Sequence, residues 1–257
     1  MTAEVGLAMG LVAAGYLGMF GVGELLHRRW QMTAETTRKL DHFAGGAIAL
    51  ALPLAFDTPW PVVVLAAGFL GFLTGALVLG SLGSVHSIGR RSVGAFLYPL
   101  SIAVVFVLSA NWCTDYAIAI LALATADVAA GIVGQRWGRH AYAAWGHGKT
   151  LEGSAAAFAV TAVVCAALLL FGGASIVVAG ATGIFTGVVV ALVEGALPWG
   201  LDNLGIPLAV LLSLSAAGSI VSAAVVLLGA ALLFGTGLAA TRLNGTLVET
   251  RQPETGP

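Results

Sequence analysis

One aspartate stands inside an apolar stretch of the sequence and asks for a chemical explanation. Asp127 lies within residues 122–134, about two helical turns from the end of that stretch. A carboxylate buried in a bilayer is costly unless it meets a cation, a metal ion or water. Gly131, Gly134 and Gly138 follow on the same side of the expected helix, where a ligand or another backbone can approach closely. We interpret Asp127 as functional; the alternative is a structural Asp–Arg pair.

A basic, glycine-containing loop follows this aspartate. It carries Arg136, Arg139 and Lys149, and Thr150 and Ser154 stand where the next helix should begin. Backbone N–H groups at a helix N-terminus bind phosphate oxygens well when Lys or Arg assists. The loop is not a P-loop, because the first glycine of that motif is missing and no strand is expected before it. It predicts phosphate binding, with an ordinary cytoplasmic basic loop as the alternative.

Three further acids are expected at the same depth as Asp127. Glu152 begins the next apolar run, Glu194 ends a later one, and Asp202 precedes Asn203 in a segment interrupted by prolines and a glycine. Four carboxylates at one depth form the hard oxygen environment that Mg²⁺ requires. Acids at a membrane boundary that simply face solvent are the alternative.

A fourth polar segment lies near the N-terminus. Arg38, Lys39, Asp41 and His42 lead into the second apolar run. Basic residues and one histidine suit contact with phosphate or attraction to anionic lipid. The pair Arg90–Arg91 is most simply a cytoplasmic anchor.

The elements that must position these residues are membrane helices. The 257 residues are 59% hydrophobic and 9% charged, with a mean hydropathy of +0.98, whereas soluble domains carry about 25% charged residues. The net charge of -1 gives no indication of a nucleic-acid partner. We predict an all-α, polytopic integral membrane protein, with one transmembrane domain over residues 1–242 and a polar tail over 243–257.

The apolar runs predict about nine transmembrane helices. Long runs fall near 5–26, 60–80, 114–134, 153–171, 175–196 and 219–239, and shorter ones near 43–57, 94–110 and 206–217. With the N-terminus outside, nine spans place all 11 Lys and Arg residues on one side of the membrane. The positive-inside rule identifies that side as the cytoplasm, so the C-terminus and the reactive residues should face it.

The polar segments together resemble the polyprenol kinase family, the CTP-dependent lipid kinases that include dolichol kinase and phytol kinase. The resemblance runs from about residue 35 to residue 210, and its nucleotide-binding core covers about 120–210. Its four parts occur in the family's order: Arg38-Lys39 with His42; Arg91-Ser92-Val93-Gly94 with Tyr98-Pro99; Asp127 with Gly134, Gly138 and Lys149-Thr150-Leu151-Glu152-Gly153-Ser154; and Glu194 with Asp202-Asn203 and Pro207.

The resemblance implies transfer of the γ-phosphoryl group of CTP to a long-chain lipid alcohol at the cytoplasmic face. It implies Mg²⁺ held by Asp127, Glu152, Glu194 and Asp202, with Asp127 or His42 accepting the alcohol proton. The triphosphate would be contacted by basic, polar and glycine residues: Arg38, Lys39, Gly131, Gly134, Arg136, Gly138, Arg139, Lys149, Thr150, Ser154 and Asn203.

Two other functions stay open at this point. Thr150 stands where this family more often has Ser, as it does in the related phosphatidate cytidylyltransferases, which would transfer CMP instead. A membrane transporter is the non-enzymatic alternative, although the outer half of the chain carries only boundary acids such as Asp57 and Asp115. Phytol, geranylgeraniol, dolichol, undecaprenol and diacylglycerol are all compatible with the sequence.

Overall fold

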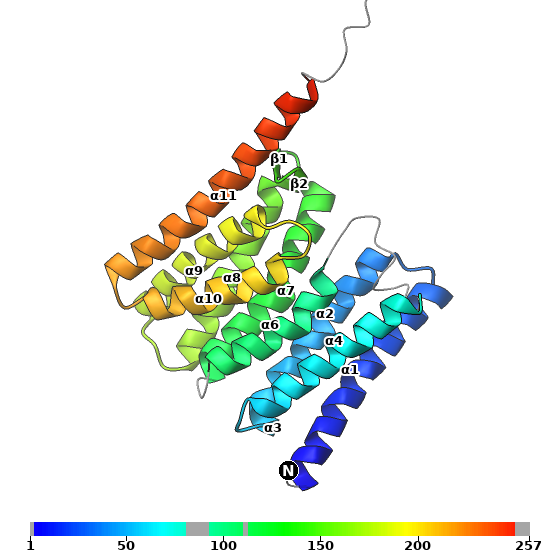
Figure 1. Ribbon diagram of the computed structural model, residues 1–257. Helices are drawn as coiled ribbons and strands as arrows, with labels where there is room; N and C mark the ends of the chain where they lie inside the picture. The colour runs from blue at the N-terminus through cyan, green and yellow to red at the C-terminus, as the bar shows by residue number, and fades with distance from the viewer. Residues whose placement is uncertain (1–2, 81–92, 110–112, 250–257) are drawn as a thin grey trace, which may run out of the picture.

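The computed structural model describes residues 3–80, 93–109 and 113–249, and it is almost entirely helical (Figure 1). Its helices are α1 (Ala3–Arg29), α2 (Ala34–Leu50), α3 (Leu52–Ala55), α4 (Trp60–Val78), α6 (Gly94–Leu108), α7 (Cys113–Trp137), α8 (Leu151–Phe171), α9 (Ile176–Ala196), α10 (Asp202–Ala216) and α11 (Ile220–Glu249). Helix α11 continues through Glu249, so the tail predicted from residue 243 begins as helix.

Six helices are long and apolar enough to cross a membrane: α1, α4, α7, α8, α9 and α11. Helices α6 and α10 are apolar but have 15 residues each, which is about 22 Å of helix against a hydrocarbon core of about 30 Å. Each predicted apolar run is mostly helical over its described residues, and the run 43–57 is divided between α2 and α3. The prediction of an α-helical membrane protein is confirmed. Nine spans with an outside N-terminus stay a prediction.

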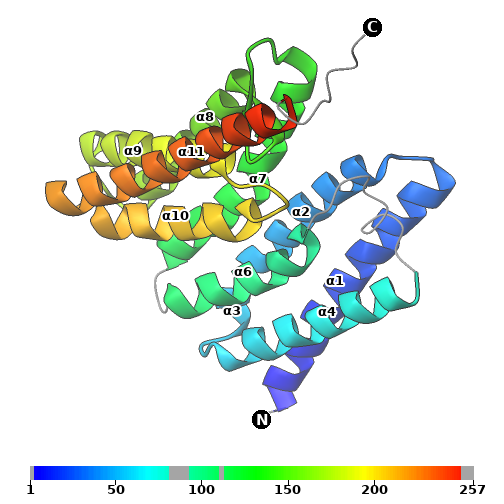
Figure 2. The ribbon, with the colours of Figure 1, turned by 45° about the horizontal axis from the view of Figure 1, so that its top comes forward.

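Helix α7 is the centre of the molecule. It contacts α2 and α6 on one side and α8 and α10 on the other, so α1, α2 and α4 lie apart from α8, α9 and α11 (Figures 1 and 2). Ile118, Ile120 and Leu123 of α7 are fully buried. Asp127 therefore belongs to a helix that has neighbours on both sides.

Small residues let the helices around α7 approach closely. A Cβ atom at Gly183 or Gly187 of α9 would come within 2.6 or 2.8 Å of backbone oxygens of α8. A Cβ at Gly46 of α2 would lie 2.5 Å from the Cβ of Ala124 on α7. Membrane helices lack a hydrophobic drive to associate with one another, and close backbone packing of this kind stabilises them.

A serine of α6 compensates for a proline in α10. Pro207 has no N–H, so the carbonyl of Asn203, four residues earlier, has no partner within its helix. The Ser101 hydroxyl donates to that carbonyl at 2.6 Å, and the Asn203 amide donates to the Gly94 carbonyl at 2.9 Å. These two bonds hold the N-terminal end of α10, and with it Asp202, against α6.

The basic loop contains a β-hairpin that the sequence did not predict. Strands β1 (Ala141–Ala144) and β2 (His147–Thr150) pair antiparallel, and Tyr142 lies opposite Lys149. Trp145 and Gly146 form the turn with φ of 52° and 75°, as a two-residue type I′ turn requires. The hairpin is held on α11, because Trp145 N–H donates to the Gly237 carbonyl and Gly146 N–H to the Thr241 hydroxyl, both at 2.9 Å.

Candidate active site

Three acids from three helices meet inside the molecule. Asp127 of α7, Glu194 of α9 and Asp202 of α10 each place a carboxylate oxygen within 4.8 Å of the others. Glu194 and Asp202 are buried, and the side chain of Asp127 is 14% exposed. These three carboxylates, the acidic cluster, are brought together because α10 packs on α7 and α9 packs on α10.

Two cations, the buried Arg38 and the half-buried Lys149, contact the acidic cluster. A guanidinium nitrogen of Arg38 lies 3.6 Å from Asp127 Oδ2. Lys149 Nζ lies 2.5 Å from Glu194 Oε1 and donates to the Glu194 carbonyl at 2.9 Å. Asp202 forms no ion pair with any residue that the structure describes; its Oδ1 accepts the Asn203 N–H at 3.0 Å. The cluster therefore holds one acid more than these two cations balance.

The charge of Lys149 is maintained by its neighbours. Burial by itself would lower the pKa of Lys149, but the charges of Glu194 and Asp202 and the hydrogen bond to Glu194 outweigh burial and raise that pKa above its usual value. Lys149 is therefore a cation at neutral pH and beyond. Of its three N–H donors, two are used by Glu194.

A polar cavity opens beside the acidic cluster, with about 1030 Å³ of empty space including the solvent at its mouth. Its walls come from α7, β2, the N-terminal turn of α8, and the connection between α9 and α10. The three acids, Arg38 and Lys149 all line it. The charged residues therefore face an open volume that a ligand can enter.

The donor set fits a hard divalent cation. Mg²⁺ is bound through one or two carboxylates, with water and substrate phosphates completing its shell. Glu194 Oε2 is buried, and no donor among the described residues reaches it. An orphaned buried oxygen beside two further carboxylates is what a metal ion would satisfy. Asp127, Glu194 and Asp202 could hold such an ion.

Several predicted site residues lie at this cavity. Gly131, Gly134, Thr150 and Ser154 line it together with the acidic cluster. The glycines also make room for protein atoms: a Cβ at Gly131 would lie 2.8 Å from Lys39 Nζ, and one at Gly134 would lie 2.7 Å from the Thr150 hydroxyl. The glycine-rich side of α7 therefore serves both the cavity and the approach of these two side chains.

The first turn of α8 offers fewer free donors than the sequence suggested. Thr150 caps this helix by accepting the Gly153 N–H at 3.1 Å. The Leu151 N–H donates to the His140 carbonyl at 3.0 Å. Ser154 is hydrogen-bonded to the Tyr142 hydroxyl at 2.7 Å. Phosphate recognition at this helix terminus would therefore depend on side chains more than on backbone N–H groups.

Glu152 does not join the acidic cluster. Its carboxylate lies 2.7 Å from His140 Nδ1 and accepts the His140 N–H, and it does not line the cavity. It points this way because it sits at the start of α8 beside the hairpin, whereas Thr150 and Ser154 turn toward the cavity. The expected fourth metal ligand instead holds the loop before β1.

Six other predicted residues do not line the cavity: Lys39, His42, Arg136, Gly138, Arg139 and Asn203. Arg136 and Arg139 are exposed, and Arg136 stacks on Trp137 at 5.2 Å. Gly138 packs against Thr150, where a Cβ would meet the Thr150 methyl group at 2.6 Å. Asn203 is fully buried and joins α10 to α6. His42, also buried, lies 4.5 Å from the Tyr98 ring and lines a different, apolar cavity. Arg90 and Arg91 lie outside the described residues.

Two aromatic residues of the cavity were missed by sequence reasoning. His147 and Trp199 line it, and their rings meet edge to face with centroids 5.3 Å apart. Trp199 has a φ of 59° and Gly200 follows with 84°; a left-handed tryptophan is rare and marks a constrained turn. The sequence showed only a tryptophan between a proline and a glycine, a pattern that ordinary membrane-boundary turns share.

The fold and the site together define an α-helical membrane protein with an acid-lined and cation-lined cavity at one end of its helices. A phytol kinase from Synechocystis sp. is 35% identical to the chain over 215 residues, which cover 81% of this chain and 90% of that protein. The chain belongs to the polyprenol and phytol kinase family, and the resemblance predicted from its sequence is confirmed. The chain matches no protein-family model and no solved structure.

Proposed function

We propose that this protein is a CTP-dependent kinase that phosphorylates the hydroxyl of a membrane isoprenoid alcohol at the cytoplasmic face. The observation that carries the proposal is the acidic cluster with its two cations at one cavity, in a member of a family that includes a phytol kinase. In the reaction, the alcohol oxygen bonds to the γ-phosphorus, the bond to the β-phosphate oxygen breaks, CDP leaves, and the hydroxyl proton passes to a protein base or water.

The residues of the cavity have different roles in the proposed phosphoryl transfer. Lys149 and Arg38 supply positive charge to the triphosphate, and Asp127, Glu194 and Asp202 would hold Mg²⁺. A bound magnesium ion neutralises charge on the transferred phosphoryl group and orients it, which is most of what phosphoryl transfer requires. Lys149 also orients Glu194 by holding one of its two oxygens. Asp127 or His42 accepts the alcohol proton.

The aromatic pair gives the nucleotide a second contact. His147 and Trp199 stand on the cavity wall, and Trp199 is 45% exposed. A nucleobase stacks on exposed aromatic rings, at about 1–3 kcal/mol for each base. We expect the base of the donor nucleotide to lie against this pair, with the triphosphate directed at Lys149.

The direct test is turnover by the purified protein. Labelled CTP or ATP, Mg²⁺ and a panel of lipid alcohols are supplied in detergent or vesicles, and the product is identified by mass. We expect an isoprenyl monophosphate with CTP. A product carrying CMP would establish cytidylyl transfer instead, and no lipid product with either nucleotide would contradict the proposal.

A variant connects the activity to the acidic cluster. Asp127→Asn should lower kcat at least about 100-fold, because phosphoryl transfer relies on positioned charge. Asp57→Asn is the matched control, since it makes the same chemical change at an exposed acid between α3 and α4. Equal turnover by both variants would show that Asp127 does not contribute to catalysis.

A further inference from the structure

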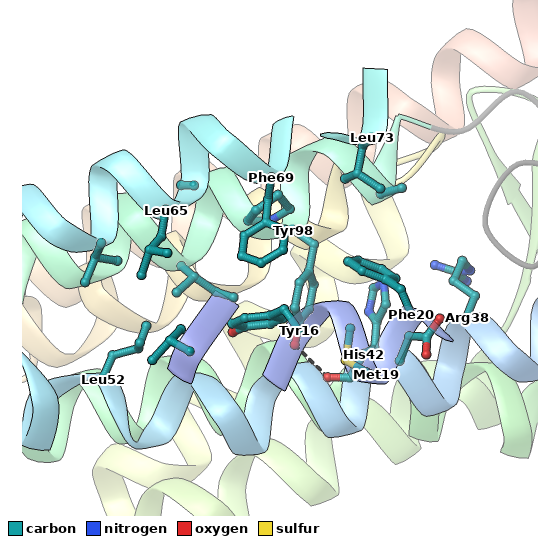
Figure 3. A pocket seen from close by; sticks show the side chains of 17 residues that line it. Tyr16, Met19, Phe20, Arg38, His42, Leu52, Leu65, Phe69, Leu73 and Tyr98 are labelled. Atoms are coloured by element: carbon teal, nitrogen blue, oxygen red, sulfur yellow. Dashed lines mark hydrogen bonds between the residues drawn. The ribbon is translucent and has the colours of Figure 1, made fainter. Parts of the chain in front are cut away.

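A second cavity lies between α1, α2, α4 and α6 (Figure 3). It has about 720 Å³ of empty space, including the solvent at its opening, and almost its entire wall is apolar. Tyr16, Phe20 and Phe69 face it together with aliphatic side chains such as Leu52 and Leu65 (Figure 3). Apolar walls of this kind bind apolar ligands.

The tyrosines of this cavity present rings and not hydroxyls. Tyr16 donates its hydroxyl to the Gly45 carbonyl at 3.0 Å, and Tyr98 donates to the His42 carbonyl at 2.6 Å. Both hydroxyls are thus satisfied by the backbone of α2. The polar side chains of the wall, apart from these tyrosines, are Arg38, Asp41 and His42, which all belong to the first half of α2.

Asp41 is the unusual member of this polar end. Its side chain lines the cavity, the residue is 8% exposed, and its Oδ2 is buried with no hydrogen-bond donor among the described residues. Helix α1 comes close beside it: a Cβ at Gly23 would lie 2.8 Å from Asp41 Oδ1. A buried carboxylate without a donor is costly, and a ligand hydroxyl at this position would supply the missing donor.

The polar end of the apolar cavity adjoins the acidic cluster. Arg38 lines both cavities and lies 3.6 Å from Asp127. A ligand whose polar group reaches Asp41 is therefore one side chain away from the cavity proposed for the nucleotide. The apolar cavity extends away from this point, and its wall on α4 runs ~17 Å from Leu73 to Val62, at about 1.5 Å per residue.

We propose that this cavity binds the isoprenoid chain of the alcohol substrate, with the hydroxyl donating a hydrogen bond to Asp41. The proposal rests on the proposed kinase function, and it adds the place of the lipid and a residue that orients its hydroxyl. The wall length of ~17 Å is little more than half of the bilayer's hydrocarbon core of about 30 Å. The wall thus matches the length of a short isoprenoid chain, and longer chains would extend from it into lipid.

Photolabelling tests the location without relying on turnover. A C20 isoprenyl alcohol that carries a diazirine on its chain is irradiated with the protein in vesicles, and labelled peptides are mapped by mass spectrometry. We expect labels on residues 12–20 and 62–73, and competition by unlabelled C20 alcohol. Labels confined to the outer faces of α8, α9 and α11 would overturn the proposal. The proposal would also be overturned if phospholipid reduced labelling as strongly as the unlabelled alcohol does, since the cavity would then hold a structural lipid.

A bulky substitution tests the same site through chain length. Ala66 is buried on the cavity wall, whereas its neighbour Ala67 is exposed on the outer face of α4. Ala66→Phe should lower kcat/KM for a C20 alcohol at least about 10-fold more than for a C10 alcohol, because steric loss grows with the buried chain. The control Ala67→Phe should leave this ratio unchanged. If Ala66→Phe turns over normally and its ratio of kcat/KM for the C20 and C10 alcohols is unchanged, this cavity does not bind the chain. The proposed kinase function would still hold.

A third variant tests Asp41 itself. Asp41→Asn keeps the shape of the side chain and should lower kcat/KM for the alcohol by roughly 10- to 100-fold, because the hydroxyl loses its hydrogen bond to a charged acceptor. KM for the nucleotide and photolabelling of α4 should stay at the wild-type values, because the chain site and the nucleotide cavity are intact. Unchanged kcat/KM for the alcohol would exclude Asp41 as its partner.

Discussion

At the scale of single residues, the charges of the acidic cluster suit the binding of a ligand and oppose folding. Three carboxylates lie within 4.8 Å, and contacts with Arg38 and Lys149 balance only two of them. Uncompensated like charges in a buried site oppose folding unless a ligand neutralises them. The cluster therefore identifies residues whose replacement should separate activity from stability.

Replacement of Asp202 should separate activity from stability most clearly. Asp202→Asn keeps an oxygen that can accept the Asn203 N–H but removes the charge that no cation pairs among the described residues. We expect kinase activity to be lost, while the free energy of unfolding stays equal or rises by up to about 3 kcal/mol, the scale of a charge pair at this separation in a partly screened site. Thermal unfolding in detergent without Mg²⁺, alongside the turnover assay, measures both. A clear loss of stability would instead make Asp202 a structural residue.

The residue scale also shows what the sequence could predict. Asp127, Glu194 and Asp202 were recognised because ionisable groups in membrane helices are costly. Such groups can be identified from the sequence alone. The partner of Glu152 and the surroundings of Asp41 were not predictable, because they depend on how the hairpin and α1 pack. Asp41 was also hard to notice, since the neighbouring basic residues already accounted for a polar segment at the membrane boundary.

At the scale of elements, the N-terminal end of α10 depends on an exchange between a proline and a serine. Ser101→Ala leaves the buried Asn203 carbonyl without a donor and should lower the free energy of unfolding by about 1–3 kcal/mol. Pro207→Ala restores a backbone N–H four residues after Asn203. The double variant should recover most of the loss. Thermal unfolding of the three variants measures this coupling, and additive losses would contradict it.

The hairpin is the element that brings Lys149 and Thr150 to the cavity, and its turn depends on backbone conformation. Gly146→Ala adds a methyl group into open space but at a φ of 75°, so its cost is conformational, about 1 kcal/mol or more. Gly229→Ala in α11 is the control, because it also has open space around it and has helical backbone. We expect only Gly146→Ala to lower stability and raise KM for the nucleotide. Equal effects would mean that the turn does not position Lys149.

The elements also show where sequence patterns stop being informative. Helices were predictable over most residues of the apolar runs, because membrane-length hydrophobicity specifies them almost alone. The hairpin was not, since the strands Ala141–Ala144 and His147–Thr150 lack the alternation that marks a half-buried strand. Its turn contains a non-glycine residue with positive φ, and its support comes from α11, almost a hundred residues later.

At the scale of the whole molecule, the N-terminus and the hairpin lie at opposite ends of the helices (Figure 1). Nine spans would place the hairpin, the acidic cluster and all 11 basic residues on the cytoplasmic side. Single cysteines introduced at Thr58, between α3 and α4, and at Arg139, before β1, should react with a membrane-impermeant thiol reagent from opposite sides. The background is a variant with Cys113 and Cys165 replaced by Ser. Labelling of both positions from one side would exclude this topology.

The guanidinium of Arg38 forms part of the wall of both cavities. A ligand that displaces it in one chamber must alter the other chamber, so the two binding equilibria are connected. Thermodynamic reciprocity then fixes the relation: the factor by which the lipid changes the affinity for the nucleotide equals the factor by which the nucleotide changes the affinity for the lipid. An enzyme whose two substrates arrive from different phases, one from the bilayer and one from water, would thereby sense the presence of each through a single side chain.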